Sequence, residues 1–225
     1  MQPFLVSIEG NIGSGKSTLM RELRARNQDW HFVDEPVENW MALKNERGES
    51  LLEVFYADKR RWSYTFQNTA LLTRILALRS AVAKWRAAGC PGSPIFVTER
   101  CIETDARVFA KMLADDGDID ALEMTLYETW FNAFKDQVPA PAAYLHVDTP
   151  VTVCHERIEK RARGGEGGDA IPIAYLDQLD SAHFRWLRDY DFKTPVMRVD
   201  NVSKDQTRIE IVEEWVKSRW LESVD

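Results

Sequence analysis

The chain has 225 residues, of which 44% are hydrophobic and 29% are charged, and its formal net charge is −7. This length suits a single domain, 1–225, with a full core, and the acidic balance disfavours nonspecific binding to nucleic acid or to an anionic membrane. No apolar run approaches the roughly 18 residues that a membrane span requires, so neither kind of partner is expected.

Short apolar runs alternate with segments of helical periodicity along the chain. The runs lack polar alternation, which is typical of strands buried on both faces of a parallel sheet. They are Phe4–Ile8, His31–Val33, Ile95–Val97, Tyr144–Val147 and Val196–Val199. This pattern predicts an α/β fold in which a five-stranded parallel sheet is flanked by helices. No targeting segment is visible before the first strand.

A glycine-rich turn follows the first strand and fits the pattern GxxxxGK[ST], in which backbone N–H groups surround phosphate oxygens. The candidate ATP-binding residues are Gly10, Asn11, Ile12, Gly13, Ser14, Gly15, Lys16, Ser17 and Thr18. Lys16 supplies charge to the β and γ phosphates, and the Ser17 hydroxyl can bind Mg²⁺. A chance glycine-rich turn is the alternative, but the strand before the loop and the amphipathic segment after it favour a P-loop.

The second strand runs into Asp34, Glu35 and Pro36. Ligands bind beyond the carboxyl ends of strands in a doubly wound sheet, and Pro36 favours an extended conformation at Glu35. A carboxylate at this edge can accept the proton of an attacking hydroxyl group. The alternative is a charge at the start of the next helix, and these residues alone do not decide between the two.

Apolar positions recur from Leu51 to about Trp85, which predicts at least one long helix that ends at Ala88–Pro94. The residues at offsets compatible with one helix face are Tyr56, Phe66, Gln67, Ala70 and Arg74. An amide suits the edge of a base and an aromatic ring can stack on it. The alternative is an amphipathic surface helix with a snorkelling arginine.

The third strand ends in Glu99 and Arg100. Glu99 is suited to Mg²⁺, directly or through water, and Arg100 to the transferring phosphoryl group or the acceptor hydroxyl. Further on, Asp105 can pair with Arg74, and Phe109 can face Phe66 across a flat ligand. The alternative for the Arg74–Asp105 pair is an ordinary surface ion pair.

A helix is predicted to begin at Thr149-Pro150 and to end at a glycine-rich stretch, 164–168. Three arginines near its end suggest a lid, about 157–170, that closes over the phosphates of ATP. They are Arg157, Arg161 and Arg163. The alternative is a solvated helix with ion pairs to neighbouring glutamates.

Two more helices are predicted beyond the lid. The first has Leu176, Leu179, His183 and Leu187 on one side, and the last carries Ile209, Val212, Trp215 and Val216. The three cysteines, Cys90, Cys101 and Cys154, are far apart in sequence and form no CxxC pair. This favours reduced thiols, so a cytoplasmic location is expected.

In these residues the chain resembles the deoxynucleoside kinase family, which contains deoxycytidine, deoxyguanosine and mitochondrial thymidine kinases. The resemblance covers nearly the whole chain. It rests on Ile8–Thr18, Glu35–Val37 with Trp40, Arg61–Gln67, Glu99-Arg100 through Asp105 and Phe109, Arg161–Arg163 and Ile171-Pro172. It implies a P-loop kinase of nucleotide salvage that transfers the γ-phosphate of ATP, with Mg²⁺, to the 5′-hydroxyl of a deoxyribonucleoside.

The resemblance also implies a role for each matching residue. Glu35 would be the general base, assisted by Arg100, and Glu99 would serve Mg²⁺. Tyr56 and Glu166 would bind the sugar 3′-hydroxyl. Trp40 would line the pocket, Gln67 would read the base edge between Phe66 and Phe109, and Arg157, Arg161 and Arg163 would form the lid. A homodimer through helices that flank the pocket, and feedback inhibition by a deoxynucleoside triphosphate, are further expectations.

The presence of Arg74 and Asp105 with the small Ala70 resembles the deoxycytidine and deoxyguanosine kinases. Deoxyadenosine, deoxyguanosine and deoxycytidine are therefore expected as acceptors over thymidine. Two features depart from the family pattern: Cys101 follows Arg100 where a small or hydroxyl residue is usual, and the lid is rich in glycine. The alternatives are a nucleoside monophosphate kinase, a thymidine-preferring or broad-specificity deoxynucleoside kinase, and an ATP-binding regulator without turnover.

Overall fold

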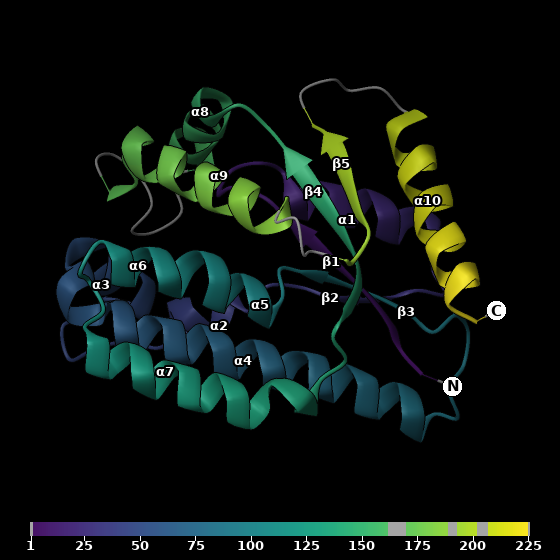
Figure 1. Ribbon diagram of the computed structural model, residues 1–225, viewed down its shortest axis with the longest axis horizontal. Coiled ribbons are helices and arrows are strands. Elements are labelled where there is room, and N and C mark those ends of the chain that lie inside the picture. The colour runs from purple at the N-terminus through teal and green to yellow at the C-terminus, as the bar shows by residue number, and fades with distance from the viewer. Residues whose placement is uncertain (1, 162–169, 189–192, 202–206, 225) are drawn as a thin grey trace.

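The computed structural model describes residues 2–161, 170–188, 193–201 and 207–224. A five-stranded sheet forms its centre, with the strand order β2-β3-β1-β4-β5 (Figure 1). The strands are β1 (Phe4–Glu9), β2 (His31–Val33), β3 (Ile95–Glu99), β4 (Pro141–Asp148) and β5 (Val196–Asp200). Every pair of neighbouring strands is parallel, so the predicted sheet is confirmed.

Helical segments connect the strands. In chain order they are α1 (Lys16–Arg26), α2 (Val37–Ala42), α3 (Leu51–Ala57), α4 (Lys59–Ala87), α5 (Ile102–Thr104), the π-helical turn η1 (Asp105–Ala110), α6 (Lys111–Asp115), α7 (Ala121–Phe134), the short 3-10 helix η2 (Lys135–Gln137), α8 (Val151–Arg161), α9 (Ile173–Leu187) and α10 (Thr207–Val224). None of the described helices combines the length and the apolar character that a membrane span needs.

Helices cover the sheet on both faces, which explains why its strands read as continuous apolar runs. Leu5 of β1 packs in a cluster with Leu71 of α4. The next residue, Val6, points the other way and packs in a cluster with Leu19 of α1 and Val212 of α10. In Figure 1, α4 and α7 accordingly lie side by side away from α10. Successive strand residues therefore bury their side chains in different layers.

The region predicted as at least one long helix forms two helices. A capping box between Ser50 and Glu53 starts α3, and Asp58 interrupts the helix after Ala57. The Asp58 carboxylate then accepts a hydrogen bond from the backbone N–H of Arg61 and so caps α4. This break separates the short helix that carries Tyr56 from the 29-residue helix that carries Phe66, Gln67, Ala70 and Arg74, so the five residues do not share one helix face as predicted.

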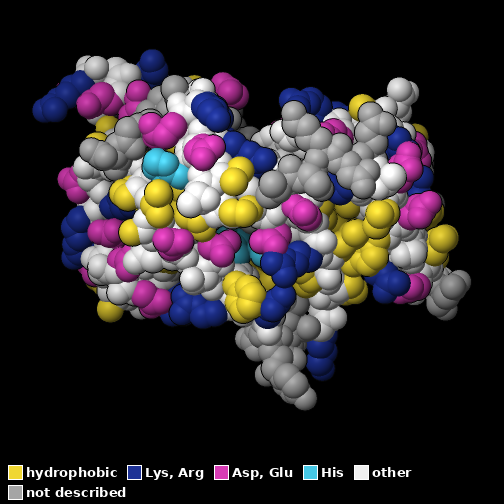
Figure 2. All heavy atoms as spheres, turned by 90° about the horizontal axis from the view of Figure 1, so that it is seen from above, with side chains coloured by type: hydrophobic (Ala, Val, Ile, Leu, Met, Phe, Trp, Pro, Cys, Tyr) yellow, Lys and Arg dark blue, Asp and Glu magenta, His cyan; other side chains and the backbone are white. Residues whose placement is uncertain are grey.

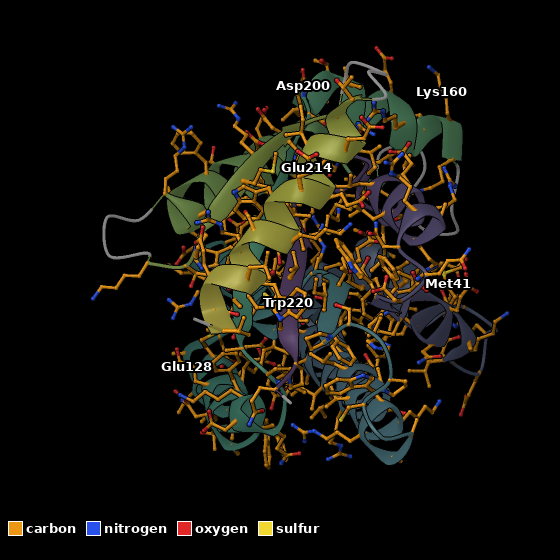
Figure 3. All side chains as sticks on the ribbon, turned by 90° about the vertical axis from the view of Figure 1, so that its right-hand side faces the viewer. Met41, Glu128, Lys160, Asp200, Glu214 and Trp220 are labelled. Carbon is orange, nitrogen blue, oxygen red and sulfur yellow. The ribbon has the colours of Figure 1, made fainter. Side chains whose placement is uncertain are left out.

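Acidic and basic side chains are interspersed on the face shown in Figure 2, and no continuous basic surface covers it. Figure 3 looks onto α10, where Glu214 is exposed and Trp220 packs partly buried against the apolar cluster beneath the helix.

Candidate active site

Close packing against α8 shapes the phosphate loop. Gly13 has a φ of 77°, and a Cβ atom at this position would lie 2.5 Å from the Cys154 carbonyl oxygen. Lys16 opens α1, and its Nζ donates a hydrogen bond to the Asn11 carbonyl oxygen at 2.7 Å. The loop therefore meets the N-terminus of a helix, where backbone N–H groups and the helix dipole favour an anion.

A second set of contacts holds the carbonyl oxygens of this loop. The Asn201 side chain donates to the Ser14 carbonyl oxygen at 2.7 Å. Arg157 donates to the same oxygen at 3.0 Å and to the Asn201 carbonyl oxygen at 3.1 Å. Arg157, predicted for the lid, thus supports the loop directly. Asn201 was not predicted as a site residue. The one feature of the sequence that could have identified it is its position directly after β5, at the carboxyl edge of the sheet, where ligands bind.

Lys16 lies in a mixed electrostatic environment. Burial and the neighbouring Arg100 guanidinium lower its pKa to about 8, while the carboxylates of Glu99, Glu35 and Glu9 act in the opposite direction. Its Nζ lies 4.0 Å from Glu99 Oε1. An anion bound in the loop would favour the protonated amine and raise its pKa again.

A cavity of about 280 Å³ opens beside the phosphate loop. The predicted site residues that line it are Ile12, Gly13, Lys16, Ser17, Glu35, Trp40, Tyr56, Phe66, Gln67, Ala70, Arg74, Glu99, Arg100, Asp105, Phe109 and Arg161. Its walls also include Asp34, Val37, Glu38 and Leu52, which were not predicted. Asp34, Val37 and Glu38 are close to Glu35 in sequence, and Leu52 lies one helical turn before Tyr56. Closeness in sequence to a predicted site residue was therefore the signal that could have identified them.

Some predicted residues do not line this cavity. Gly10, Asn11, Ser14, Gly15, Thr18 and Arg157 belong to the loop or to the structure that supports it. Arg163 and Glu166 lie outside the described residues, as does most of the predicted lid. The structure thus gathers the P-loop and the acceptor residues around one cavity, and the lid residues stay predictions.

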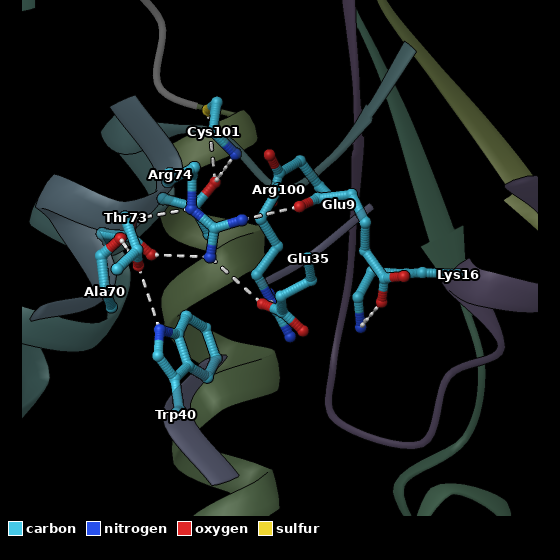
Figure 4. Close-up of polar contacts among 12 residues, drawn as sticks. Glu9, Lys16, Glu35, Trp40, Ala70, Thr73, Arg74, Arg100 and Cys101 are labelled. Carbon is cyan, nitrogen blue, oxygen red and sulfur yellow. Dashed lines mark hydrogen bonds and ion pairs between the residues drawn. The ribbon is translucent and has the colours of Figure 1, made fainter. Parts of the chain in front are cut away.

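Glu35 is held through one of its two carboxylate oxygens. Its Oε1 lies 3.1 Å from Arg74 Nη2 and 3.4 Å from Arg100 Nε (Figure 4). Within the described chain, Oε2 has no hydrogen-bond partner. Burial alone would raise the pKa of Glu35, but Arg74, Arg100 and Lys16 outweigh burial and hold it below its ordinary value. Glu35 is therefore an ionised carboxylate with one oxygen available beside the cavity.

The predicted pair of Arg74 and Asp105 is confirmed as a contact. Arg74 donates from Nε to Asp105 Oδ2 at 2.8 Å and from Nη2 to Oδ1 at 3.2 Å, and a third bond runs from Nη1 to the Glu99 carbonyl oxygen at 2.7 Å. The two side chains are only 6% and 3% exposed, so the surface ion-pair alternative is wrong. Burial would lower the pKa of Arg74, but its carboxylate partners raise it.

Aromatic rings and one amide form another part of the cavity wall. Phe66 stacks on Phe55 with ring centroids 4.4 Å apart, and the Trp40 ring packs against Phe66 in a T-shaped arrangement with centroids 5.2 Å apart. The Trp40 indole donates to the Thr73 hydroxyl at 3.0 Å, which fixes the indole ring. Gln67 is 2% exposed, and its amide has no hydrogen-bond partner in the described parts of the chain. A ligand that presents hydrogen-bonding atoms to this amide would supply the partners that a buried polar group requires.

Arg100 directly follows β3 and has a left-handed backbone, at a φ of 65°, which costs a residue other than glycine about 1–2 kcal/mol. Its backbone N–H donates to the Ile8 carbonyl oxygen at 3.0 Å, and its guanidinium lies 4.7 Å from the centre of the Phe109 ring. Arg100 Nη1 also lies 3.1 Å from Nε2 of the buried His183. Sequence reasoning placed His183 only on an apolar helix side, because nothing local links residues 83 positions apart.

The oxygen donors at the cavity fit a divalent metal that arrives with a nucleotide. Ser17 is exposed and Glu99 is 8% exposed, and both line the cavity. The described residues include no cluster of three or more His, Cys, Asp or Glu side chains suited to a resident metal. Mg²⁺ commonly takes one or two protein ligands and completes its shell with phosphate and water, so Ser17 and Glu99 are sufficient protein donors for it.

A family model described as deoxynucleoside kinase matches residues 6–224. The chain is 34% identical over 212 residues to deoxycytidine kinase 2 of Gallus gallus, a match that covers 87% of this chain and 76% of the relative. It is 32% identical over 237 residues to deoxycytidine kinase of Homo sapiens, with coverages of 94% and 89%. It is 31% identical over 205 residues to mitochondrial deoxyguanosine kinase of Xenopus laevis, with coverages of 83% and 74%.

Proposed function

Because this chain belongs to the deoxynucleoside kinase family, we propose that its cavity places the 5′-hydroxyl of a deoxynucleoside between the P-loop and Glu35. The enzyme is a deoxynucleoside kinase, which phosphorylates its acceptor with ATP. This membership leaves the nucleoside monophosphate kinase alternative without support. The observation that carries the proposed arrangement is Glu35 itself, which keeps Oε2 available at the wall of the cavity that Lys16 also lines.

In this mechanism Glu35 accepts the hydroxyl proton as the acceptor oxygen attacks phosphorus. A carboxylate of lowered pKa is adequate because phosphoryl transfer depends mainly on positioning and on charge stabilisation. Lys16 offsets charge on the β and γ phosphates, and Arg100 stabilises charge on the group being transferred. Mg²⁺, held by Ser17 and Glu99, would neutralise phosphate charge when bound.

The nucleoside would lie along the aromatic wall. Gln67 supports base recognition because its buried amide lacks a partner in the described chain, and Phe66 and Phe109 offer apolar surfaces on the cavity wall. Tyr56 and Glu166 are proposed for the sugar 3′-hydroxyl. Arg157, Arg161 and Arg163 are proposed for ATP.

The Arg74–Asp105 pair supports a preference among acceptors. The buried Arg74 guanidinium is held by two carboxylates and by the Glu99 carbonyl oxygen, and these bonds leave one N–H group of Nη1 for a ligand. Such a donor suits the acceptor atoms of cytosine or of a purine. The relatives named above are deoxycytidine and deoxyguanosine kinases. We therefore favour deoxycytidine, deoxyguanosine and deoxyadenosine over thymidine.

A homodimer through α4 and α7 is proposed on the basis of exposed apolar side chains. These helices lie side by side (Figure 1). The exposed residues are Leu72 and Leu76 of α4 and Leu122, Leu126 and Trp130 of α7, with exposures between 39% and 70%. A cytoplasmic location, favoured by the three free cysteines, stays a proposal as well.

Replacement of Glu35 by Gln tests the general base. Glu35→Gln keeps the size of the side chain but cannot accept the proton, so kcat should fall at least ~10²-fold while the KM for ATP changes little. The matched control is Glu38→Gln, which removes a neighbouring carboxylate from the same cavity wall and should leave kcat within a few-fold of wild type. A Glu35→Gln enzyme with near wild-type kcat would rule out the role.

A further inference from the structure

We propose that His183 of α9 is a positioning residue that fixes the direction of the Arg100 guanidinium and so supports phosphoryl transfer. The inference rests on the proposed function, because it assigns His183 an effect only through Arg100. Its basis is a chain of two contacts, from the Leu179 carbonyl oxygen to His183 Nδ1 at 2.7 Å and from His183 Nε2 to Arg100 Nη1 at 3.1 Å.

These contacts determine the tautomer of His183. The Leu179 carbonyl oxygen can only accept a hydrogen bond, so Nδ1 carries the hydrogen and donates it. In a neutral imidazole the other nitrogen, Nε2, then holds a lone pair, which accepts a hydrogen bond from Arg100. The opposite tautomer would place two lone pairs together at one end of the ring and two N–H groups together at the other. Helical spacing of i to i+4 along α9 therefore presents an acceptor to Arg100.

The environment of His183 keeps the ring neutral and fixed in place. The side chain is fully buried, and burial and the charge of Arg100 lower its pKa well below the ordinary value. His146 lies parallel to it with ring centroids 6.3 Å apart, and Phe109 meets it edge-on at 6.2 Å. The acceptor at Nε2 is thus present throughout the neutral pH range.

Three side chains together restrain the guanidinium of Arg100. Glu35 contacts its Nε at 3.4 Å, Phe109 covers its face at 4.7 Å, and His183 accepts from Nη1. The remaining N–H groups of Arg100 have no partner among the described residues, and Arg100 lines the cavity. Because Arg100 is only 3% exposed, loss of the His183 acceptor would leave a buried donor unsatisfied. The guanidinium would then turn toward another acceptor and away from the transferring group.

Two substitutions separate the acceptor from the packing of the ring. His183→Phe keeps a buried ring without an acceptor and should lower kcat at least ~10-fold while the KM for ATP stays within about 3-fold. His183→Gln can offer its amide oxygen near the position of Nε2 and should return kcat to within about 3-fold of wild type. The matched control is His146→Phe, a change to the stacked neighbour that does not contact Arg100, and kcat should change less than about 3-fold. Equal losses in the Phe and Gln variants would overturn the proposal.

A double-mutant cycle with Arg100→Gln shows whether His183 acts through Arg100. His183→Phe should cause no further loss of kcat in the Arg100→Gln background. An equal loss in both backgrounds would overturn this inference and leave the proposed function intact. A near wild-type rate for Arg100→Gln alone would instead overturn the proposed role of Arg100, and with it the role of His183.

A measurement on the unaltered enzyme avoids any dependence on variant folding. NMR of protein labelled with ¹⁵N-histidine distinguishes a protonated ring nitrogen from an unprotonated one. His183 should show a protonated Nδ1 and an unprotonated Nε2 at pH 7. A protonated Nε2, in the opposite tautomer or in the imidazolium, would overturn the proposal because such a nitrogen cannot accept a bond from Arg100.

Discussion

Arg74 joins two carboxylates that have different proposed roles. Its Nε and Nη2 bind Asp105, which we assign to the base side of the cavity, and Nη2 also contacts Glu35, the proposed general base. Its Nη1 binds the backbone of β3 at Glu99. Under the proposed roles, one buried guanidinium would couple recognition of the base to placement of the general base, a link that neither residue type nor spacing indicates.

Removal of this pair should change both specificity and rate. Arg74→Met combined with Asp105→Ala should shift the ratio of kcat/KM for deoxycytidine over thymidine toward thymidine by at least ~10-fold. The rate with every acceptor should also fall, because Glu35 loses one of its two arginine partners. A coupled assay with the four deoxynucleosides measures both effects. Arg79→Met, an exposed change on the same helix, is the control, and unchanged ratios in the double variant would exclude the base-reading pair.

His146 predicts a dependence of stability on pH. Burial, the largest cause, lowers its pKa from 6.5 to about 4 in the folded chain, although Asp148 opposes this shift. The unfolded chain binds the proton first as pH falls, so this contribution to stability is complete above pH 6.5 and is lost toward pH 4. Between pH 7.5 and 5.0 the loss from this group is about 2 kcal/mol.

Urea unfolding at the two pH values, in wild type and in His146→Phe, isolates this contribution. Other titrating groups are common to both proteins, so they cancel in the difference between the two pH dependences. Wild type should lose about 2 kcal/mol more free energy of unfolding than the variant. Parallel pH dependences in the two proteins would mean that His146 is accessible to protons in the folded state.

At the level of elements, the P-loop and α8 fit together only because Gly13 has no side chain. In Gly13→Ala the added methyl would meet the Cys154 carbonyl oxygen at 2.5 Å, so the loop or α8 must shift. The KM for ATP should therefore rise at least ~10-fold and the midpoint of thermal unfolding should fall. The control is Gly48→Ala, which has a similar φ of 80° and no atom within 4 Å. If both variants lost the same stability and kept ATP binding, the close packing would not matter.

The elements that the sequence predicted well are those specified by local residue patterns. Strands such as Phe4–Glu9 read as apolar because they are buried on both faces, and the glycines of the P-loop mark its conformation directly. The break at Asp58 was not predicted, although the charged run Asp58–Arg61 interrupts the apolar pattern there. The π-helical turn at Asp105–Ala110 was missed as well, since it has no pattern that differs from an ordinary helix.

The site residues also divide into those that local sequence patterns place and those that only tertiary packing places. The positions of Glu35, Glu99 and Arg100 beside the cavity could be predicted because these residues follow or end strands at the carboxyl edge of the sheet. The contacts of His183 and Asn201 were not, because each meets its partner only after α9 or β5 has packed in place. Tertiary packing supplies the groups that hold the reactive side chains, and a single sequence contains no record of it.

For the whole molecule, large apolar side chains are exposed on two adjacent helices, α4 and α7. Leu76 of α4 is 51% exposed and Leu122 of α7 is 70% exposed, and both belong to the face that we assign to a homodimer. Large exposed apolar side chains gathered on adjacent helices favour association with a second surface. The double variant Leu76→Glu and Leu122→Glu should therefore convert a dimer to a monomer, because two copies of the face would bring buried carboxylates together.

Sedimentation equilibrium measures this directly as a halving of the molar mass. The control is Leu221→Glu, a similarly exposed leucine on α10, which should leave the dimer intact. The cavity is lined by α4 residues that point away from this face, such as Gln67 and Arg74, so a folded monomer should still bind ATP at the P-loop. Wild-type protein that sediments as a monomer at all concentrations tested would refute the proposed dimer. A double variant with the wild-type mass would place the interface on another face.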